Sequence, residues 1–153
     1  MAVVISLLAG VLLERLLFYQ EMAERANVES MISLFKSGLR IHMAELLIHG
    51  RAQEYPSLAT ENPVDWLDEK PENYRGSLPD GHSSELQSGS WYYDMPTHTL
   101  IYLVKHGRYF KPDSEGLKRV RLHVVPVVNP DTDSKQPRVL GMQMLLVEPY
   151  RWL

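Results

Sequence analysis

The first 31 residues, MAVVISLLAGVLLERLLFYQEMAERANVESM (1–31), decide the fold of this chain. Residues 1–13 carry no charge, and an apolar stretch resumes after Glu14 and Arg15. No proline interrupts residues 3–50, so we predict a single helix of nearly 50 residues there. The first half of this helix is apolar on every side, whereas its second half becomes amphipathic.

The second half of the predicted helix carries one apolar stripe. Its apolar residues recur every three or four positions, which places them on one face: Val28, Ile32, Phe35, Leu39, Met43 and Leu46. We expect four of them to hold the helix against a sheet: Ile32, Phe35, Leu39 and Met43. Gly50 stands where a helix-ending glycine is typical. Glu21 and Arg25 have the spacing of an ion pair along a helix.

The apolar half needs a partner outside this chain. A cleaved secretion signal is a poor interpretation, because no Lys or Arg precedes the apolar run and no Ala-x-Ala site follows it. A membrane-spanning helix needs about 20 apolar residues, whereas residues 1–13 rise only about 20 Å along a helix. Counting on to Tyr19 reaches that length but includes Glu14 and Arg15, whose long side chains could extend toward one membrane surface. Nothing else in the chain is large enough to cover this half, so we expect it to contact lipid or other protein molecules.

The remaining two thirds of the chain carry turn and strand patterns. Residues 51–90 are rich in Pro, Gly, Ser, Asn and acidic residues, and we predict a long loop there. Within it, Asn62 before Pro63 is typical of a capped helical turn. Strand patterns follow, of which KRVRLHVVPVV (118–128) alternates apolar and polar residues and RVLGMQMLLVEPY (138–150) is its expected partner.

Together these patterns predict an α+β fold. The long N-terminal helix, apolar and then amphipathic, packs on a C-terminal antiparallel β-sheet of four to five strands. We divide the chain into an apolar half-helix at residues 1–27 and a globular domain at residues 28–153. This domain consists of the amphipathic half-helix, the loop at residues 51–90 and the sheet at residues 91–153. A length of 153 residues suits one domain with an appendage.

This layout resembles that of the type IV pilins and of the pseudopilins of type II secretion. The resemblance rests on VVISLLAGVLLERLLFYQEMAERANVE (3–29), in which LAGVLL (8–13) stands where the family has a small-residue helix interior. The series ENPVDWL, PENYRG, GSWYYD and LIYLV is similar to segments of pseudopilin-like proteins. The layout covers nearly the whole chain, and the specific match covers about its first 30 residues.

One feature departs from the family pattern. Pilin precursors carry a short basic leader that ends in glycine, followed by an apolar start with a glutamate at the fifth mature position. Neither is present, and aligning the Ala9–Gly10 pair with the family places Met1 some eight residues into the mature part. The resemblance therefore implies a start codon assigned too far downstream, or a sequence that begins late. Glu14 does not align with the family glutamate.

The resemblance implies a structural subunit of a type IV pilus-like or type II secretion pseudopilus filament. A single helix would anchor it in the bacterial inner membrane, with the globular domain in the periplasm. Its partners would be sister subunits, the inner-membrane assembly machinery and membrane lipid. Nucleic acid is not expected as a primary partner, because the net charge is −3 and no concentrated basic face is evident. The residues expected to pack between subunits lie in the apolar half: Val4, Leu7, Leu8, Val11 and Leu12.

Other functions remain as alternatives. A membrane-tethered periplasmic sensing or ligand-binding domain would use the helix as a tether and the aromatic residues Trp91, Tyr92 and Tyr93 as its site. An enzyme is not expected, because the chain has no cysteine and its serines lack the context of an activated nucleophile. We expect no cofactor.

Metal binding is disfavoured at the two places that suggest it. His42 and His49 are two helical turns apart, which is too far to share one ion. Asp131, Asp133 and Ser134 offer closely spaced oxygens, and some major pseudopilins bind calcium in a C-terminal loop. The glycine and the distal glutamate of the well-defined calcium loop are missing, so we favour an ordinary polar turn.

Overall fold

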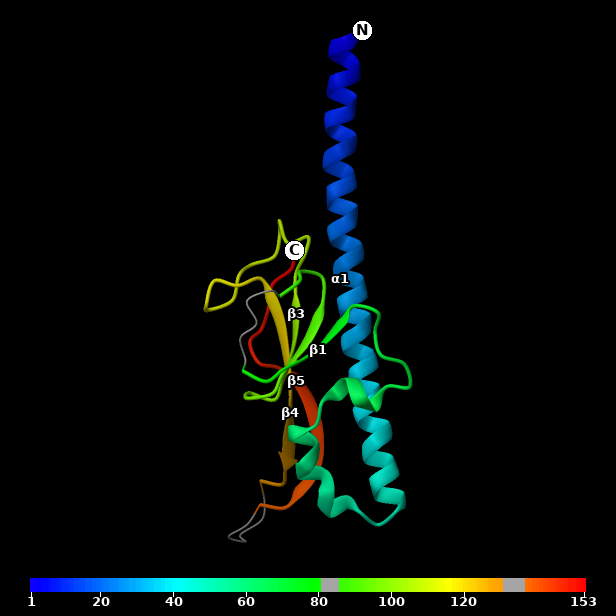
Figure 1. The fold of residues 1–153 in the computed structure, drawn as a ribbon, viewed down its shortest axis with the longest axis vertical. Helices are drawn as coiled ribbons and strands as arrows, with labels where there is room; N and C mark the ends of the chain where they lie inside the picture. The colour runs from blue at the N-terminus through cyan, green and yellow to red at the C-terminus, as the bar shows by residue number, and fades with distance from the viewer. Residues whose placement is uncertain (81–85, 131–136) are drawn as a thin grey trace.

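The computed structural model of the chain describes residues 1–80, 86–130 and 137–153. One long helix, α1 (Ala2–Ile48), runs through the molecule, as predicted (Figure 1). It ends in a Schellman motif, because Gly50 has a positive φ of 67° and donates its N–H to the carbonyl of Leu47 at 3.1 Å. The N–H of Arg51 donates to the carbonyl of Leu46 at 2.7 Å. The glycine therefore ends the helix where the sequence indicates.

The described residues form one five-stranded sheet, in which the order of the strands follows their order in the chain. The strands are β1 (Tyr74–Leu78), β2 (Trp91–Asp94), β3 (Thr99–Leu103), β4 (Arg119–Val128) and β5 (Val139–Leu146). β1 pairs with β2 in parallel, and each later pair is antiparallel. The fold is α+β, with a long helix packed against a mixed sheet rather than a purely antiparallel one.

Residues 51–90, predicted as a loop, contain regular structure. Two 3-10 helices, η1 (Ala52–Thr60) and η2 (Pro63–Trp66), precede β1. The Asn62 side chain accepts a hydrogen bond from the Val64 N–H at 3.1 Å, which confirms the predicted cap. The sheet begins at β1 (Tyr74–Leu78), which pairs with β2, and not at residue 91 as predicted. The sequence of β1, YRGSL, lacks the apolar alternation that marks β4.

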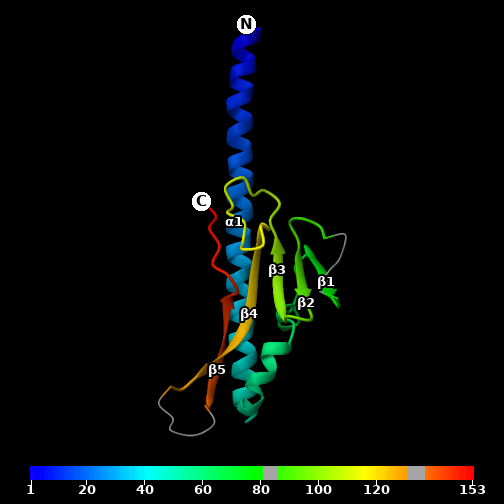
Figure 2. The same ribbon diagram turned by 90° about the vertical axis from the view of Figure 1, so that its left-hand side faces the viewer.

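One face of the sheet packs against the second half of α1 (Figures 1 and 2). Phe35 is fully buried, and its ring meets the ring of Trp91 edge to face at a centroid distance of 5.2 Å. Leu39 is also buried, whereas Ile32 and Met43 are partly buried at the margin of the core. In its first half β4 buries every second residue on this side of the sheet.

Contact between α1 and the rest of the domain begins before residue 28. Glu21 is buried, and the ring centroid of Phe18 lies 6.2 Å from that of Tyr109. The structure thus differs from the predicted division at residue 27, because the loop after β3 reaches back along the helix. The part of the helix whose side chains are all exposed ends at residue 20.

Candidate functional site

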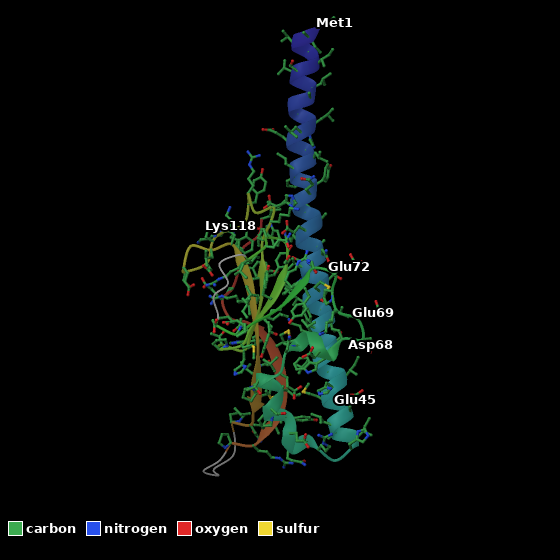
Figure 3. All side chains as sticks on the ribbon, viewed as in Figure 1. Met1, Glu45, Asp68, Glu69, Glu72 and Lys118 are labelled. Carbon is green, nitrogen blue, oxygen red and sulfur yellow. The ribbon has the colours of Figure 1, made fainter. Side chains whose placement is uncertain are left out.

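The N-terminal part of α1 projects beyond the sheet domain, and the side chains of residues 1–20 are all exposed (Figures 1 and 3). An 18-residue window of this helix has a mean hydropathy of 2.0 and none of it is buried. By length and composition, the helix could cross a membrane. A monomeric soluble protein rarely exposes so large a contiguous apolar surface. This apolar half-helix is therefore the main candidate site for an interaction.

The apolar half-helix has two faces of different character. The five residues predicted to pack between subunits are all exposed: Val4, Leu7, Leu8, Val11 and Leu12. With 3.6 residues per turn they share one side of the helix. Small residues gather on roughly the opposite side, beside Leu13: Ala2, Ser6, Ala9 and Gly10. Apart from Gly10 itself, its two chain neighbours and the nearby backbone of the helix, no atom lies within 4 Å of the place where a side chain on Gly10 would begin.

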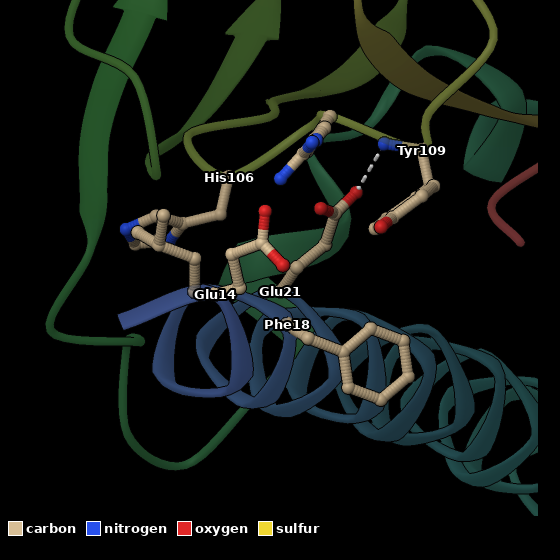
Figure 4. Close-up of a pocket in the computed structure, with 7 residues that line it drawn as sticks. Glu14, Phe18, Glu21, His106 and Tyr109 are labelled. Carbon is tan, nitrogen blue, oxygen red and sulfur yellow. Dashed lines mark hydrogen bonds between the residues drawn. The ribbon is translucent and has the colours of Figure 1, made fainter. Parts of the chain in front are cut away.

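Directly C-terminal to the apolar half-helix, Glu21 binds two segments that are distant in the sequence and holds them to α1. Its side chain is 2% exposed, and it has no cationic partner among the described residues. Its Oε1 accepts a hydrogen bond from the Tyr109 N–H at 2.8 Å (Figure 4). The same oxygen accepts one from the indole N–H of Trp152 at 3.0 Å. A buried carboxylate is stabilised by such donors, because burial has removed its water.

One turn further along α1, Glu24 receives donors from β3 and the loop that follows it. The Tyr102 hydroxyl donates to Oε1 at 2.8 Å, and the Lys105 N–H donates to the same oxygen at 2.7 Å. The His106 N–H donates to Oε2 at 2.7 Å, and His106 Nδ1 lies 2.8 Å from that oxygen. Burial raises the pKa of Tyr102, and the hydrogen bond to Glu24 raises it further. Glu21 and Glu24 together are termed the carboxylate clamp below.

The carboxylate clamp corrects one prediction and adds residues that the sequence analysis missed. Arg25 pairs with Glu29 at 2.8 Å and not with Glu21, which accepts its hydrogen bonds from Tyr109 and Trp152 instead. A signal for the clamp exists in the spacing of Glu21, Glu24 and Val28. Steps of three and four place these residues on one helical face, so the carboxylates share the side that Val28 buries.

A small cavity lies between the carboxylate clamp and the apolar half-helix (Figure 4). Its volume is about 120 Å³, and its walls come from α1 and the loop after β3: Glu14, Leu17, Phe18, Glu21, His106, Arg108 and Tyr109. Ligand pockets usually measure about 300–1,000 Å³. This cavity is therefore too small for an organic substrate.

The aromatic residues proposed as a ligand platform are engaged in packing. Trp91, Tyr92 and Tyr93 are all buried, and the Tyr93 hydroxyl donates to the carbonyl of Thr60 at 3.1 Å. Their ring faces are thus unavailable to a ligand.

The sheet face away from α1 carries an open depression of about 640 Å³. Asp94, Thr99, Arg121 and His123 line it together with apolar residues. Among the described residues, Asp94 Oδ1 is a buried atom without a hydrogen-bond partner. A ligand-binding function would place its site in this depression and not on the aromatic residues.

Neither suggested metal site gains support. The His42 ring stacks on Trp66 at a centroid distance of 6.0 Å, and its Nδ1 lies 3.5 Å from a Glu45 oxygen. No group of three potential metal-ligating side chains occurs within residues 1–80, 86–130 and 137–153. The possible calcium loop lies outside the described residues: Asp131, Asp133 and Ser134.

Comparison with known proteins gives no relative. The chain matches no protein-family model, no curated protein and no solved structure.

Proposed function

We propose that the protein is a structural subunit of a type IV pilus-like or type II secretion pseudopilus filament. In this proposal the apolar half-helix anchors the subunit in the bacterial inner membrane, and the sheet domain lies in the periplasm. The observation that carries the proposal is the continuity of α1. One helix joins an apolar half with exposed side chains to a half whose stripe is buried against the sheet.

The physical basis is that two surroundings can cover the same apolar surface. Lipid shields the half-helix while the subunit waits in the membrane, and a helix satisfies its own backbone hydrogen bonds there. Sister helices can replace the lipid in a filament, where packing between close helices supplies the association energy. The bulky face and the small-residue face of the half-helix suit such packing, because small residues let a neighbouring helix approach.

The ligand-binding alternative has a weaker physical basis. It relied on exposed aromatic rings, and Trp91, Tyr92 and Tyr93 are buried. A helix that served only as a membrane tether would also not need bulky residues on one face and small residues on the opposite face. The depression beside Asp94 would be the place to look for a ligand if subunits do not associate.

A charge in the apolar half-helix tests the proposal directly. Val11→Asp places a carboxylate on the bulky face, at a cost of about 2.5–3.5 kcal/mol in the middle of a membrane helix. Ile41→Asp is the matched control, since Ile41 is 61% exposed and Val11 is 55% exposed on the same helix. We expect the filament fraction sheared from producing cells to be lost with Val11→Asp and kept with Ile41→Asp.

A cross-linking experiment reports on the helix contacts themselves. The chain has no cysteine, so Leu8→Cys and Ile41→Cys introduce one thiol each. Under oxidation we expect disulfide-linked dimers from Leu8→Cys, because the half-helices pack together and the single thiol of each chain can join it to one neighbour. Normal filaments from Val11→Asp, or a full-length chain that stays monomeric without detergent, would contradict the proposal.

A further inference from the structure

The end of the sheet domain nearest the apolar half-helix is built from two segments. The loop at residues 105–118 and the C-terminal residues 151–153 lie together there (Figures 1 and 2). They are joined by backbone hydrogen bonds, among them Lys111 N–H to the carbonyl of Arg151 at 2.9 Å. We term these residues the proximal edge. Glu21 fixes both segments to α1 at one point, through Tyr109 and Trp152.

The proximal edge carries cations without anionic partners. Five exposed basic residues of this edge form no ion pair with a described carboxylate: Lys105, Arg108, Lys111, Lys118 and Arg151. Lys118 lies at this end of the domain (Figure 3). Its Nζ donates to the carbonyl of Gly107 at 2.6 Å.

The acidic residues of the same region are already paired. Arg119 binds Asp113 at 2.6 Å and also Glu115, while Arg121 lies 3.3 Å from Glu148. The positive charge of the proximal edge is therefore not cancelled locally. Three acidic side chains of α1 face this edge and are outnumbered by its cations: Glu14, across the small cavity from Arg108, the buried Glu21 and the partly buried Glu24.

Aromatic side chains mark the level at which the proximal edge meets the helix. Phe18 contacts both Tyr19 and Tyr109 edge to face, at centroid distances of 5.9 and 6.2 Å. The Arg108 guanidinium lies 5.8 Å from the centre of the Tyr109 ring. Aromatic residues with neighbouring cations are typical of the boundary between hydrocarbon and headgroups. About 15 residues of α1 lie N-terminal to Phe18, and they rise roughly 23 Å along the helix axis.

We infer that the proximal edge binds anionic phospholipid headgroups while the apolar half-helix lies in a bilayer. The inference rests on the membrane anchorage in the proposed function. Arg108, Lys111 and Lys118 supply the attraction, and the Phe18–Tyr109 pair sets the depth. The domain is thereby held against the membrane surface in one orientation, with its sheet running away from the lipid.

The test uses the full chain in lipid vesicles and a single label on the edge. Leu117→Cys gives one thiol at an exposed position, because the chain has no cysteine of its own. A fluorophore at this thiol is quenched by nitroxide-labelled headgroups only when the edge touches them. Vesicles of phosphatidylcholine alone are compared with vesicles containing phosphatidylglycerol. The charge variant is Arg108→Gln/Lys111→Gln/Lys118→Gln, and the matched control is Lys36→Gln/Arg40→Gln/Arg138→Gln, three exposed cations elsewhere.

We expect quenching in anionic vesicles that is several-fold stronger than in neutral vesicles. Each cation removed should weaken docking roughly fivefold. The charge variant should therefore fall to the neutral-vesicle level, and the control should not. Molar salt on the unsubstituted chain should act like the charge variant, because it screens the same charges.

Two outcomes would overturn the inference in different ways. Equal quenching in both kinds of vesicle, or in parent and charge variant, would show that the anchored domain does not bind anionic headgroups. The proposed membrane anchorage would stand in that case. A chain that fails to enter vesicles at all would refute the membrane anchorage and the headgroup contact together.

Discussion

Removing the buried carboxylate of Glu21 should destabilise the domain strongly. In Glu21→Ala, the Trp152 indole N–H and the Tyr109 N–H lose their acceptor. An unsatisfied buried donor costs about 1–3 kcal/mol, so we expect a loss of about 2–4 kcal/mol in the free energy of unfolding. Glu21→Gln should cost only about 1–2 kcal/mol, because the amide oxygen can still accept both bonds without the charge.

Denaturant unfolding of the full chain in a mild detergent measures this effect. Intrinsic fluorescence suits the assay, since Trp91 and Trp152 are both buried and change surroundings on unfolding. Glu29→Ala is the control, because its exposed ion pair with Arg25 should contribute only a few tenths of a kcal/mol. Glu21→Ala within about 0.5 kcal/mol of the parent would refute the reasoning, since that is the range of ordinary surface substitutions. Equal losses for Glu21→Ala and Glu21→Gln would refute the account of the shared oxygen.

Two further predictions concern the core and the ion pairs. Phe35→Ala should lower the free energy of unfolding by about 3–5 kcal/mol, whereas Leu34→Ala, at a 47% exposed neighbour, should change it by less than about 1 kcal/mol in the same assay. Burial pushes the pKa of Asp113 upward, but the Leu117 N–H and the Arg119 guanidinium outweigh burial and hold it below its usual 3.8. The charged Asp113 side chain therefore stabilises the fold fully above pH 3.8, and this stabilisation is lost as the pH falls through the lowered pKa. In Asp113→Asn, the free energy of unfolding, measured as a function of pH, should depend less on pH in that acidic range.

The features that local patterns encode were predictable. The length of α1 follows from the absence of proline before Gly50 and from the glycine itself. The buried positions Phe35 and Leu39 follow from the spacing of the apolar stripe. The β4–β5 hairpin follows from alternation and from matching strand patterns.

The features that depend on distant contacts were not predictable in the same way. Glu21 is buried because Tyr109 and Trp152, 88 and 131 residues away, donate to it, and no local pattern reports such donors. Local spacing suggested Arg25 as its partner instead. β1 is short and contains Gly76, so its parallel pairing with β2 comes from the tertiary structure and not from strand propensity.

The position of the carboxylate clamp determines how the domain carries mechanical load. A pull along the axis of α1 from its N-terminal end reaches the sheet domain first at the Phe18–Tyr109 contact and at the hydrogen bonds of Glu21 and Glu24. These two carboxylates pass tension to the end of β3, to the loop after it and to the last residues of the chain, and the buried stripe around Phe35 lies further along the same helix. Because these hydrogen bonds lie within one helical turn, breaking them would leave the strand pairing of the sheet intact and would lengthen the unsupported part of the helix.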